Sequence, residues 1–431
     1  MEFQPIASLL HESQHEKKVR VRGWVHRKRS SGGVAFIVIR DASGIIQVAV
    51  KKDRVSDESM RAAEEALMEA HVETEGIVQK DRRAPGGFEM RALDFRIRHS
   101  AKPFPISRDK STEFLLDIRH LWIRSQQQTH VMKVKAQMLE SIRLLFKKKG
   151  YFETTPPIIV SGACEGGSTL FTFDYFGKKA FLSQSAQLYL EALIYSLEKV
   201  YAITPSFRAE KSRTVRHLAE YWHVEGEEAY MDLDGLLKFE EELVTFVCHD
   251  LAKKSSEELR ALGRDPAELL KVKTPFKRLR YNDAVELLRE KGSHIKEGHD
   301  LGAEEERLLT EKEAQPIFVT HFPKKIKAFY MSEDPEDSKT VLCNDCLAPE
   351  GYGEIIGGSQ REDDVKKLEA RLRTEGQNPN NYEWYLDLRR YGSVPHSGFG
   401  LGAERLLRWI AKLEHIRDTV PFPRVINRSY P

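Results

Sequence analysis

Two charged segments of this chain carry residues suited to binding a polyphosphate. The first segment, residues 207–222, reads FRAEKSRTVRHLAEYW. An apolar run, a charged turn and a returning apolar run predict an antiparallel hairpin with a loop rich in cations. Arginine in such a loop offers planar, bidentate donors to phosphate oxygens. A solvated basic hairpin would have the same composition, so this segment alone does not define a function.

The second segment, residues 392–410, reads GSVPHSGFGLGAERLLRWI. Its glycines allow a backbone to approach a ligand closely, and Arg405 stands at the start of a predicted apolar helix. An arginine at this place can stack on a purine ring as well as meet phosphate. Glycines that only pack a helix would give the same pattern, so the second segment is also weak evidence alone.

Together, the two segments resemble motifs 2 and 3 of the class II aminoacyl-tRNA synthetases, in the order of that family. Residues 150–160, GYFETTPPIIV, resemble motif 1, in which a helix and a strand form the dimer interface. Three further stretches resemble asparaginyl enzymes of the archaeal and eukaryotic type in particular: EGGSTLF at 165–171, FLSQSAQLYLE at 181–191 and GEIIGGSQRE at 353–362.

The resemblance implies a two-step ligase reaction. ATP and L-asparagine would form asparaginyl adenylate and pyrophosphate, and the asparaginyl group would then pass to tRNA-Asn. An ionised carboxylate is already a nucleophile, so positioning and charge stabilisation should supply most of the catalysis. The implied partners are ATP with Mg²⁺, L-asparagine, tRNA-Asn and a second copy in a homodimer, and no membrane.

The resemblance also assigns residues to ATP. Arg208 would bind the α-phosphate and the substrate carboxylate, and Arg405 would cover the adenine and reach the γ-phosphate; these are the two expected catalytic residues. Magnesium would be held by Glu354 and Asp345, since this hard ion prefers carboxylates together with phosphate oxygens. The full expected ATP set is Arg208, Glu210, His217, Tyr221, Glu354 and Arg405.

For the amino acid, the resemblance indicates Glu165 and Gln187 as ligands of the substrate ammonium. Arg361 would donate to the side-chain carbonyl of asparagine, and Glu225 would accept from its NH₂ group or merely hold Arg361 in place. Leu190 stands where aspartyl enzymes carry a lysine, and an apolar residue there cannot neutralise a substrate carboxylate. We therefore expect asparagine to be selected over aspartate.

The serious alternative is an aspartyl-tRNA synthetase, including one that charges both tRNA-Asp and tRNA-Asn. A paralogue that binds RNA without aminoacylating it is disfavoured by the presence of Arg208, Glu354 and Arg405. An asparagine synthetase derived from the same family is disfavoured because such relatives lack the anticodon-binding barrel.

Residues 17–100 contain five short β-rich runs with one helical patch between them, which is the pattern of an OB-fold barrel. The stretch from GWVHRKR to SGIIQ, residues 23–47, resembles the anticodon-binding barrel of the aspartyl, asparaginyl and lysyl subgroup. Phe36 is placed to stack on an anticodon base, and Arg27 and Gln47 to read base edges and backbone. The alternative for Phe36 is a residue of the barrel core.

The expected fold is α+β, with three parts. Residues 1–103 would form the OB-fold anticodon-binding domain and 104–125 a linker. Residues 126–431 would form the catalytic domain, an antiparallel sheet flanked by helices, with a mostly helical insertion at about 231–312. Gly226 is unusual, because a glycine inside the motif 2 strand is mildly unfavourable.

Composition sets wider limits on the 431-residue chain. Charged residues make up 31% and the net charge is +2, which fits a well-charged surface without excluding RNA. We expect no signal peptide and no membrane span, since no run approaches ~18 apolar residues. Four cysteines argue against a disulfide scaffold and favour a reduced, cytoplasmic setting. Cys343 and Cys346 are expected to be two ordinary buried thiols rather than a zinc pair.

Overall fold

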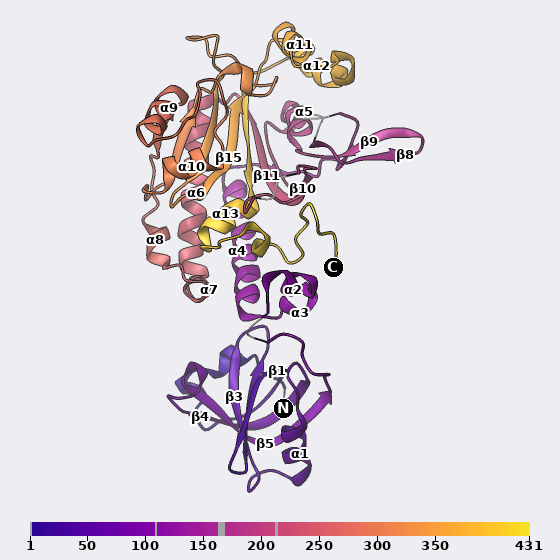
Figure 1. The fold of residues 1–431 in the computed structure, drawn as a ribbon, viewed down its shortest axis with the longest axis vertical. Helices are drawn as coiled ribbons and strands as arrows, with labels where there is room; N and C mark the ends of the chain where they lie inside the picture. Colours follow the sequence, from indigo (N-terminus) through magenta and orange to yellow (C-terminus); the bar gives the residue numbers. More distant parts are fainter. Residues whose placement is uncertain (1, 108–109, 163–168, 212–213) are drawn as a thin grey trace. The chain divides into compact units, whose positions relative to one another are not determined.

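The structure is a computed structural model, and it describes residues 2–107, 110–162, 169–211 and 214–431. The chain divides into two compact units, Met1–Leu115 and Leu116–Pro431 (Figure 1). Within the described residues, no helix has the length and apolar character needed to cross a membrane. Each unit has its own hydrophobic core.

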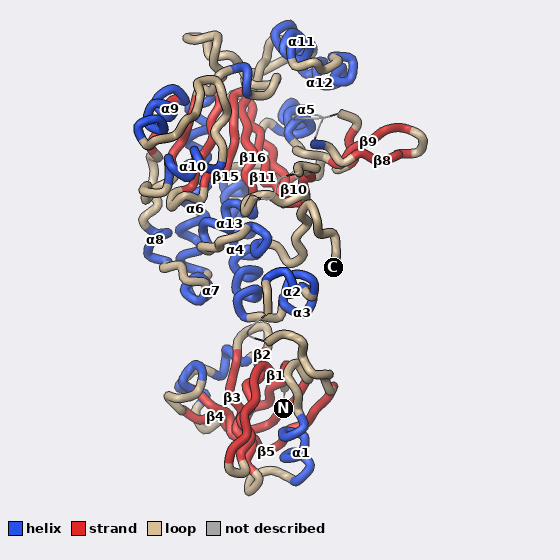
Figure 2. Tube along the Cα trace, viewed as in Figure 1, coloured by secondary structure: helices blue, strands red, loops and turns tan. Residues whose placement is uncertain are grey.

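The first unit is a closed five-stranded barrel with the strand order β1-β2-β3-β5-β4 (Figure 2). One helix, α1, lies between β3 and β4 along the chain, as the sequence pattern predicted. The expected OB-fold barrel is therefore confirmed. The elements are β1 Lys18–Ser31, β2 Val34–Arg40, β3 Ile45–Lys51, α1 Asp57–Glu65, β4 His71–Lys80 and β5 Phe88–His99.

The second unit is built on an eight-stranded sheet with the order β12-β13-β14-β15-β16-β11-β10-β6. Its central pairs are antiparallel, but β12–β13 and β10–β6 at the two ends are parallel, so the sheet is mixed rather than antiparallel throughout. The strands are β6 Phe152–Glu153, β10 Lys199–Phe207, β11 Glu220–Ala229, β12 Lys277–Arg280, β13 Ile317–Thr320, β14 Cys343–Ala348, β15 Gly353–Gln360 and β16 His396–Gly402.

Two long helices, α4 (Gln126–Lys148) and α6 (Leu233–Lys254), share the main core with the sheet and with α13 (Ala403–Ile410). Amphipathic spacing explains this packing, because Val131, Val134 and Met138 recur on one face of α4 and are fully buried. The remaining helices are α2 Thr112–Asp117, α3 Arg119–Trp122, α5 Gln187–Leu197, α7 Ser256–Ala261, α8 Pro266–Leu270, α9 Tyr281–Glu290, α10 Ala303–Thr310, α11 Val365–Thr374 and α12 Glu383–Arg390.

The segment from 231 to 312 contains helices α6 to α10 and also the edge strand β12. It is therefore more than a cover over the catalytic sheet. Its first helix, α6, helps to form the main core, and its last helix, α10, packs beside β15 (Figure 1).

The motif 1 segment does not form the single strand expected after Gly150. β6 joins the large sheet, whereas β7 (Ile159–Val160) belongs to a separate three-stranded sheet with β8 (Thr172–Tyr175) and β9 (Lys178–Leu182). Pro156 and Pro157 lie between the two short strands. Proline has no N–H to donate to a ladder, so the strand breaks there and the chain passes from one sheet to the other.

Cys343 and Cys346 both lie on β14 and are almost completely buried. They enter different apolar clusters: Cys343 packs with Phe322 and Val341, and Cys346 belongs to the main core. The prediction of two ordinary buried thiols is confirmed.

The structure accounts for Gly226, which lies opposite Phe399 of β16 in the middle of the sheet. A Cβ at this position would lie 2.9 Å from the Phe399 ring and 3.4 Å from the Phe146 ring. The two rings are stacked, with centroids 6.3 Å apart. Glycine at position 226 therefore leaves the space on β11 that the rings of Phe146 and Phe399 occupy as an aromatic layer.

We predict that Gly226→Ala destabilises the catalytic domain by about 1–3 kcal/mol, because a methyl group would overpack this aromatic layer. Chemical denaturation followed by circular dichroism would measure the change. Gly162→Ala is a matched control, since the atoms nearest to its Cβ would be 4.0 Å away. An unchanged midpoint for Gly226→Ala would show that the layer can shift to admit a methyl group.

Candidate active site

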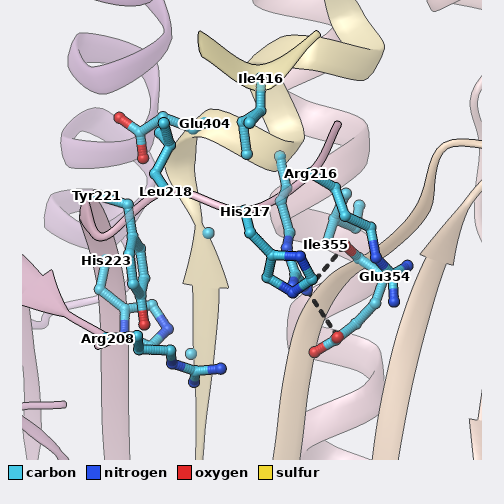
Figure 3. Close-up of a pocket in the computed structure, with 13 residues that line it drawn as sticks. Arg208, Arg216, His217, Leu218, Tyr221, His223, Glu354, Ile355, Glu404 and Ile416 are labelled. Carbon is cyan, nitrogen blue, oxygen red and sulfur yellow. Dashed lines mark hydrogen bonds and ion pairs between the residues drawn. The ribbon is translucent and has the colours of Figure 1, made fainter. Parts of the chain in front are cut away.

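A cavity of about 530 Å³ opens over the centre of the catalytic sheet, and a smaller pocket of about 70 Å³ adjoins it. Arg208, His223 and Glu354 line both, so the two hollows form one continuous site. Figure 3 shows the residues that line the smaller pocket. The strands that supply these residues, β10, β11 and β15, belong to the same sheet. Helix α13 contributes Arg405 to the smaller pocket.

The predicted hairpin around Arg208 is present. β10 and β11 pair antiparallel up to Phe207 and Glu220, and the Arg208 N–H donates to the carbonyl of Ala219 at 3.0 Å. The guanidinium carbon of Arg208 lies 5.7 Å from the centroid of the Tyr221 ring. A cation and an aromatic face thus lie together at the mouth of the hairpin, as Figure 3 shows.

His217 lies in the loop of the same hairpin. Its Nε2 is 3.7 Å from a carboxylate oxygen of Glu210. Burial lowers the pKa of His217, and the positive charge of Arg405 lowers it further. The imidazole is therefore neutral at pH 7 and can donate or accept a hydrogen bond without adding charge.

Glu354 and Arg405, which both line the smaller pocket, form an ion pair with Nη1 2.7 Å from Oε2. Burial alone would raise the pKa of Glu354, but Arg405 and Lys327 together lower it to about 2. Glu354 is consequently ionised throughout the physiological range.

Asp345 pairs with Lys327 in the same manner, at 3.0 Å. Burial raises the pKa of Asp345 to about 7 despite the lysine, and the nearby charge of Glu354 adds to the rise. A Cβ on Gly357 would lie 3.4 Å from Oε1 of Glu354 and 3.8 Å from Oδ1 of Asp345. The two carboxylates therefore converge on one small space left free by the glycine.

This donor set fits magnesium bound together with a phosphate and does not fit a closed protein cage. Mg²⁺ usually takes one or two carboxylates and completes its shell with substrate oxygens and water. In the described part of the chain, no three His, Cys, Asp or Glu side chains converge in a way that could hold a metal ion.

Gln187, Glu225 and Arg361 all line the larger cavity, so the structure brings three of the predicted amino-acid ligands together. Glu225 accepts from the Ser185 hydroxyl and, at 2.8 Å, from the N–H of Ala186. These bonds fix its carboxylate at the cavity wall.

The alternative in which Glu225 holds Arg361 is wrong, because that partner is Glu227. Arg361 donates from Nε and Nη2 to the Glu227 carboxylate and from Nη1 to the Ser359 hydroxyl at 2.7 Å. Burial by itself would lower the pKa of Arg361, but Glu227 and Glu191 raise it above its ordinary value. Arg361 is thus a buried cation whose charge is already compensated.

Glu227 is a residue that sequence reasoning missed, although a signal was available. It lies two residues after Glu225 on β11, and side chains two apart on a strand share a face. A second missed residue is Glu191, which accepts from Gln187 Nε2 at 3.0 Å and also binds Arg389 and His396. This buried network orients the Gln187 amide.

Leu190 does not border the cavity, contrary to the expectation. Its side chain is fully buried in a small apolar cluster with Ala186, Ile194, Val200 and Ala202. The helical turn of α5 directs Gln187 to the cavity and Leu190 into the cluster, so Leu190 cannot meet the substrate side chain directly. Glu165 lies outside the described residues.

On the barrel, the predicted anticodon residues occupy one outer face. Phe36 and Ala49 are register partners, as are Arg27 with Val38 and Val38 with Gln47. Phe36 is partly exposed and lies outside the barrel core, which contains its neighbours Ala35 and Ile37. The guanidinium carbon of Arg29 sits 4.7 Å from the Phe36 ring centroid, and Gln47 donates to Glu89 at 2.6 Å.

The fold and this site define a class of protein. Residues 111–426 match the family described as tRNA synthetases class II (D, K and N). Residues 19–98 match the family described as OB-fold nucleic acid binding domain. The chain belongs to the class II tRNA synthetases of the D, K and N group.

Within that class, similar proteins with a third or more of their residues identical include several asparaginyl enzymes. Asparagine–tRNA ligase of Thermococcus kodakarensis is 53% identical over 416 residues, which cover 96% of each chain. The crystal structure of asparaginyl-tRNA synthetase from Pyrococcus horikoshii complexed with asparaginyl-adenylate is 50% identical, with a TM-score of 0.97 over 100% of both chains. The asparaginyl-tRNA synthetase of Entamoeba histolytica in complex with asparaginyl-adenylate is 33% identical, with a TM-score of 0.89 over 97% of both chains.

Proposed function

We propose that this chain activates L-asparagine with ATP and transfers the asparaginyl group to tRNA-Asn. The observation that carries the proposal is the charge balance at the amino-acid end of the cavity. Arg361 is already paired with Glu227, and Glu225 adds a further carboxylate to the wall. A neutral side chain suits this balance better than a negative one.

A carboxamide has one acceptor oxygen and one NH₂ donor, and the cavity wall offers the complementary groups. Arg361 can donate to the carbonyl, and Glu225 can accept from the NH₂. Aspartate would place a second negative charge beside Glu225, while the nearby cation Arg361 is already paired with Glu227. Like charges placed together at a recognition surface cost several kcal/mol.

At the nucleotide end, Arg208 and Arg405 are the residues that would meet the phosphates and stabilise the charge that develops as the adenylate forms. Tyr221 offers a ring face to adenine, and Glu210 and the neutral His217 would hold the adenine end and the phosphates. Glu354 and Asp345 would hold magnesium, which neutralises phosphate charge when it is bound. We place this reaction in the cytoplasm, since Cys248, Cys343 and Cys346 are free thiols.

The direct test is asparagine-dependent exchange of pyrophosphate into ATP, measured side by side with aspartate. We expect a preference for asparagine on the order of 10⁴-fold in kcat/KM, because an aspartate side chain would leave buried polar groups mismatched. Comparable rates with aspartate would reject the asparaginyl proposal and support an aspartyl enzyme that charges both tRNAs.

The outer face of the barrel suits single-stranded RNA, since Phe36 exposes an aromatic ring among Arg27, Arg29 and Gln47. We propose that this face reads the tRNA-Asn anticodon. Stacking of one base on an aromatic side chain contributes roughly 1–3 kcal/mol. Phe36→Ala should therefore lower kcat/KM for tRNA by about 5- to 150-fold and leave asparagine-dependent exchange unchanged.

Trp24→Ala is a matched control for this prediction. Trp24 is another exposed aromatic of the barrel, but it packs with His71 and Arg40, at the opposite end of β2 from Phe36. Equal losses of tRNA charging in the two variants, or a loss of exchange in Phe36→Ala, would contradict an anticodon role for Phe36.

We also propose that two copies form a homodimer through the motif 1 segment. This segment exposes Phe152, Ile158 and Ile159, at 54%, 37% and 46% of their surface. Exposed large apolar residues of this kind favour an interface, and two-fold dimers are the commonest assembly. Analytical ultracentrifugation should give twice the 49.6 kDa of one chain, whereas a monomer throughout the micromolar range would reject the dimer.

A further inference from the structure

Helix α10 sends one buried carboxylate, that of Glu306, into the nucleotide site. Glu306 is only 3% exposed. Its two oxygens accept from both terminal nitrogens of Arg216, with Nη2 2.9 Å from Oε1. Oε2 also accepts from the backbone N–H of Glu354 at 2.7 Å. One side chain thus joins two segments that are far apart in the sequence.

Both segments belong to the candidate nucleotide site. Arg216 lies next to His217 in the sequence, in the same hairpin as Arg208. It lines the smaller pocket together with both residues (Figure 3). Glu354 opens β15 and pairs with Arg405. Glu306 itself comes from the segment that was expected to be an insertion, outside motifs 2 and 3.

The residue before Glu354 is shaped to fit this carboxylate. Gly353 has φ +78°, and a Cβ there would lie 2.5 Å from Oε2 of Glu306 and 3.0 Å from Nη1 of Arg216. Only glycine meets both the backbone conformation and the close approach without strain. The sequence at the start of β15 therefore accommodates Glu306.

The charges nearby give Glu306 a further task. Arg216 and Arg405 both lower the pKa of Arg408, after the larger effect of its burial, so the three cations are close enough to interact. Without a carboxylate paired with Arg216, the three arginines would repel one another. Arg216 could then turn into the pocket. A bidentate pair fixes the rotation as well as the charge of a guanidinium.

We infer that Glu306 is a positioning residue for ATP, which clamps the motif 2 hairpin through Arg216 and the start of β15 through Glu354. It acts through these residues rather than by touching the nucleotide. The inference rests on the proposed amino-acid activation and gives helix α10 a function in it. Correct placement of binding groups is worth large factors in rate and affinity, so small displacements are costly.

The test is Glu306→Gln, which keeps the shape and removes the charge. Removal of one partner from a buried charged hydrogen bond should raise the KM for ATP in pyrophosphate exchange about tenfold or more. The KM for asparagine should change less than twofold, because Gln187, Glu225 and Arg361 do not contact Glu306. Glu304→Gln is the matched control: Glu304 is on the same helix but pairs with Arg307 at the surface.

A change that raises both KM values equally would overturn the inference, as would a lower melting temperature with an unchanged KM for ATP. Coupling provides a second criterion. Arg216→Gln alone and together with Glu306→Gln should raise the KM for ATP by similar factors, since the two residues act as one unit. Independent, multiplicative effects would contradict the clamp.

Direct titration of ATP with Mg²⁺ by calorimetry separates this inference from the proposed function. If the wild-type protein fails to exchange pyrophosphate with asparagine, the proposed function fails, while the calorimetric comparison still tests Glu306. Weaker ATP binding by Glu306→Gln, with Glu304→Gln unchanged, would support the clamp in either case. Equal binding by all three proteins would reject it.

Discussion

The catalytic cavity depends on the pairing of opposite charges, which are buried in one pair and partly buried in the other two. Arg405 pairs with Glu354, Lys327 with Asp345 and Arg361 with Glu227. Isolated charges in such a place would be expensive, and paired charges remain tolerable only while their geometry is maintained. Both carboxylates proposed to hold magnesium are therefore paired with a cation: Glu354 with Arg405, which is proposed to meet phosphate, and Asp345 with Lys327. When ATP and Mg²⁺ bind together, phosphate can pair with the cation and Mg²⁺ with the carboxylate. Either ligand alone would leave one member of the pair without an opposite charge.

The rest of the fold holds these pairs in register. Glu354 and Asp345 lie on the neighbouring strands β15 and β14, and Glu227 and Arg361 are brought together by β11 and the chain that follows β15. The glycines at 226, 353 and 357 leave the room that aromatic rings and carboxylates need. The stacked rings of Phe146, Tyr201 and Phe399 pack helix α4 against strands β10 and β16 in the main core. Packing and charge thus specify the same arrangement.

Sequence reasoning located the barrel, the hairpin, Arg208, Glu354 and Arg405, because these signals lie in contiguous motifs. It missed Glu227 and Glu306, whose partners Arg361 and Arg216 lie 134 and 90 residues away. A single sequence carries no record of such long-range pairs. It misplaced Leu190, which lies three residues after Gln187 on the same helix. This spacing alone does not determine which of the two side chains faces the cavity. Pro156 and Pro157 in the sequence are enough to predict a break between β6 and β7. Only the structure shows that the chain passes from one sheet to another there.

The paired-charge account is tested most directly by calorimetric titration of ATP with and without Mg²⁺. If phosphates alone draw Arg405 and Lys327 from their partners, Glu354 and Asp345 are left as partly buried, unpaired carboxylates. The account predicts that ATP without Mg²⁺ binds at least about tenfold more weakly than ATP with Mg²⁺, since leaving a buried charged group unsatisfied costs more than ~1.4 kcal/mol. Equal affinity under the two conditions would contradict it.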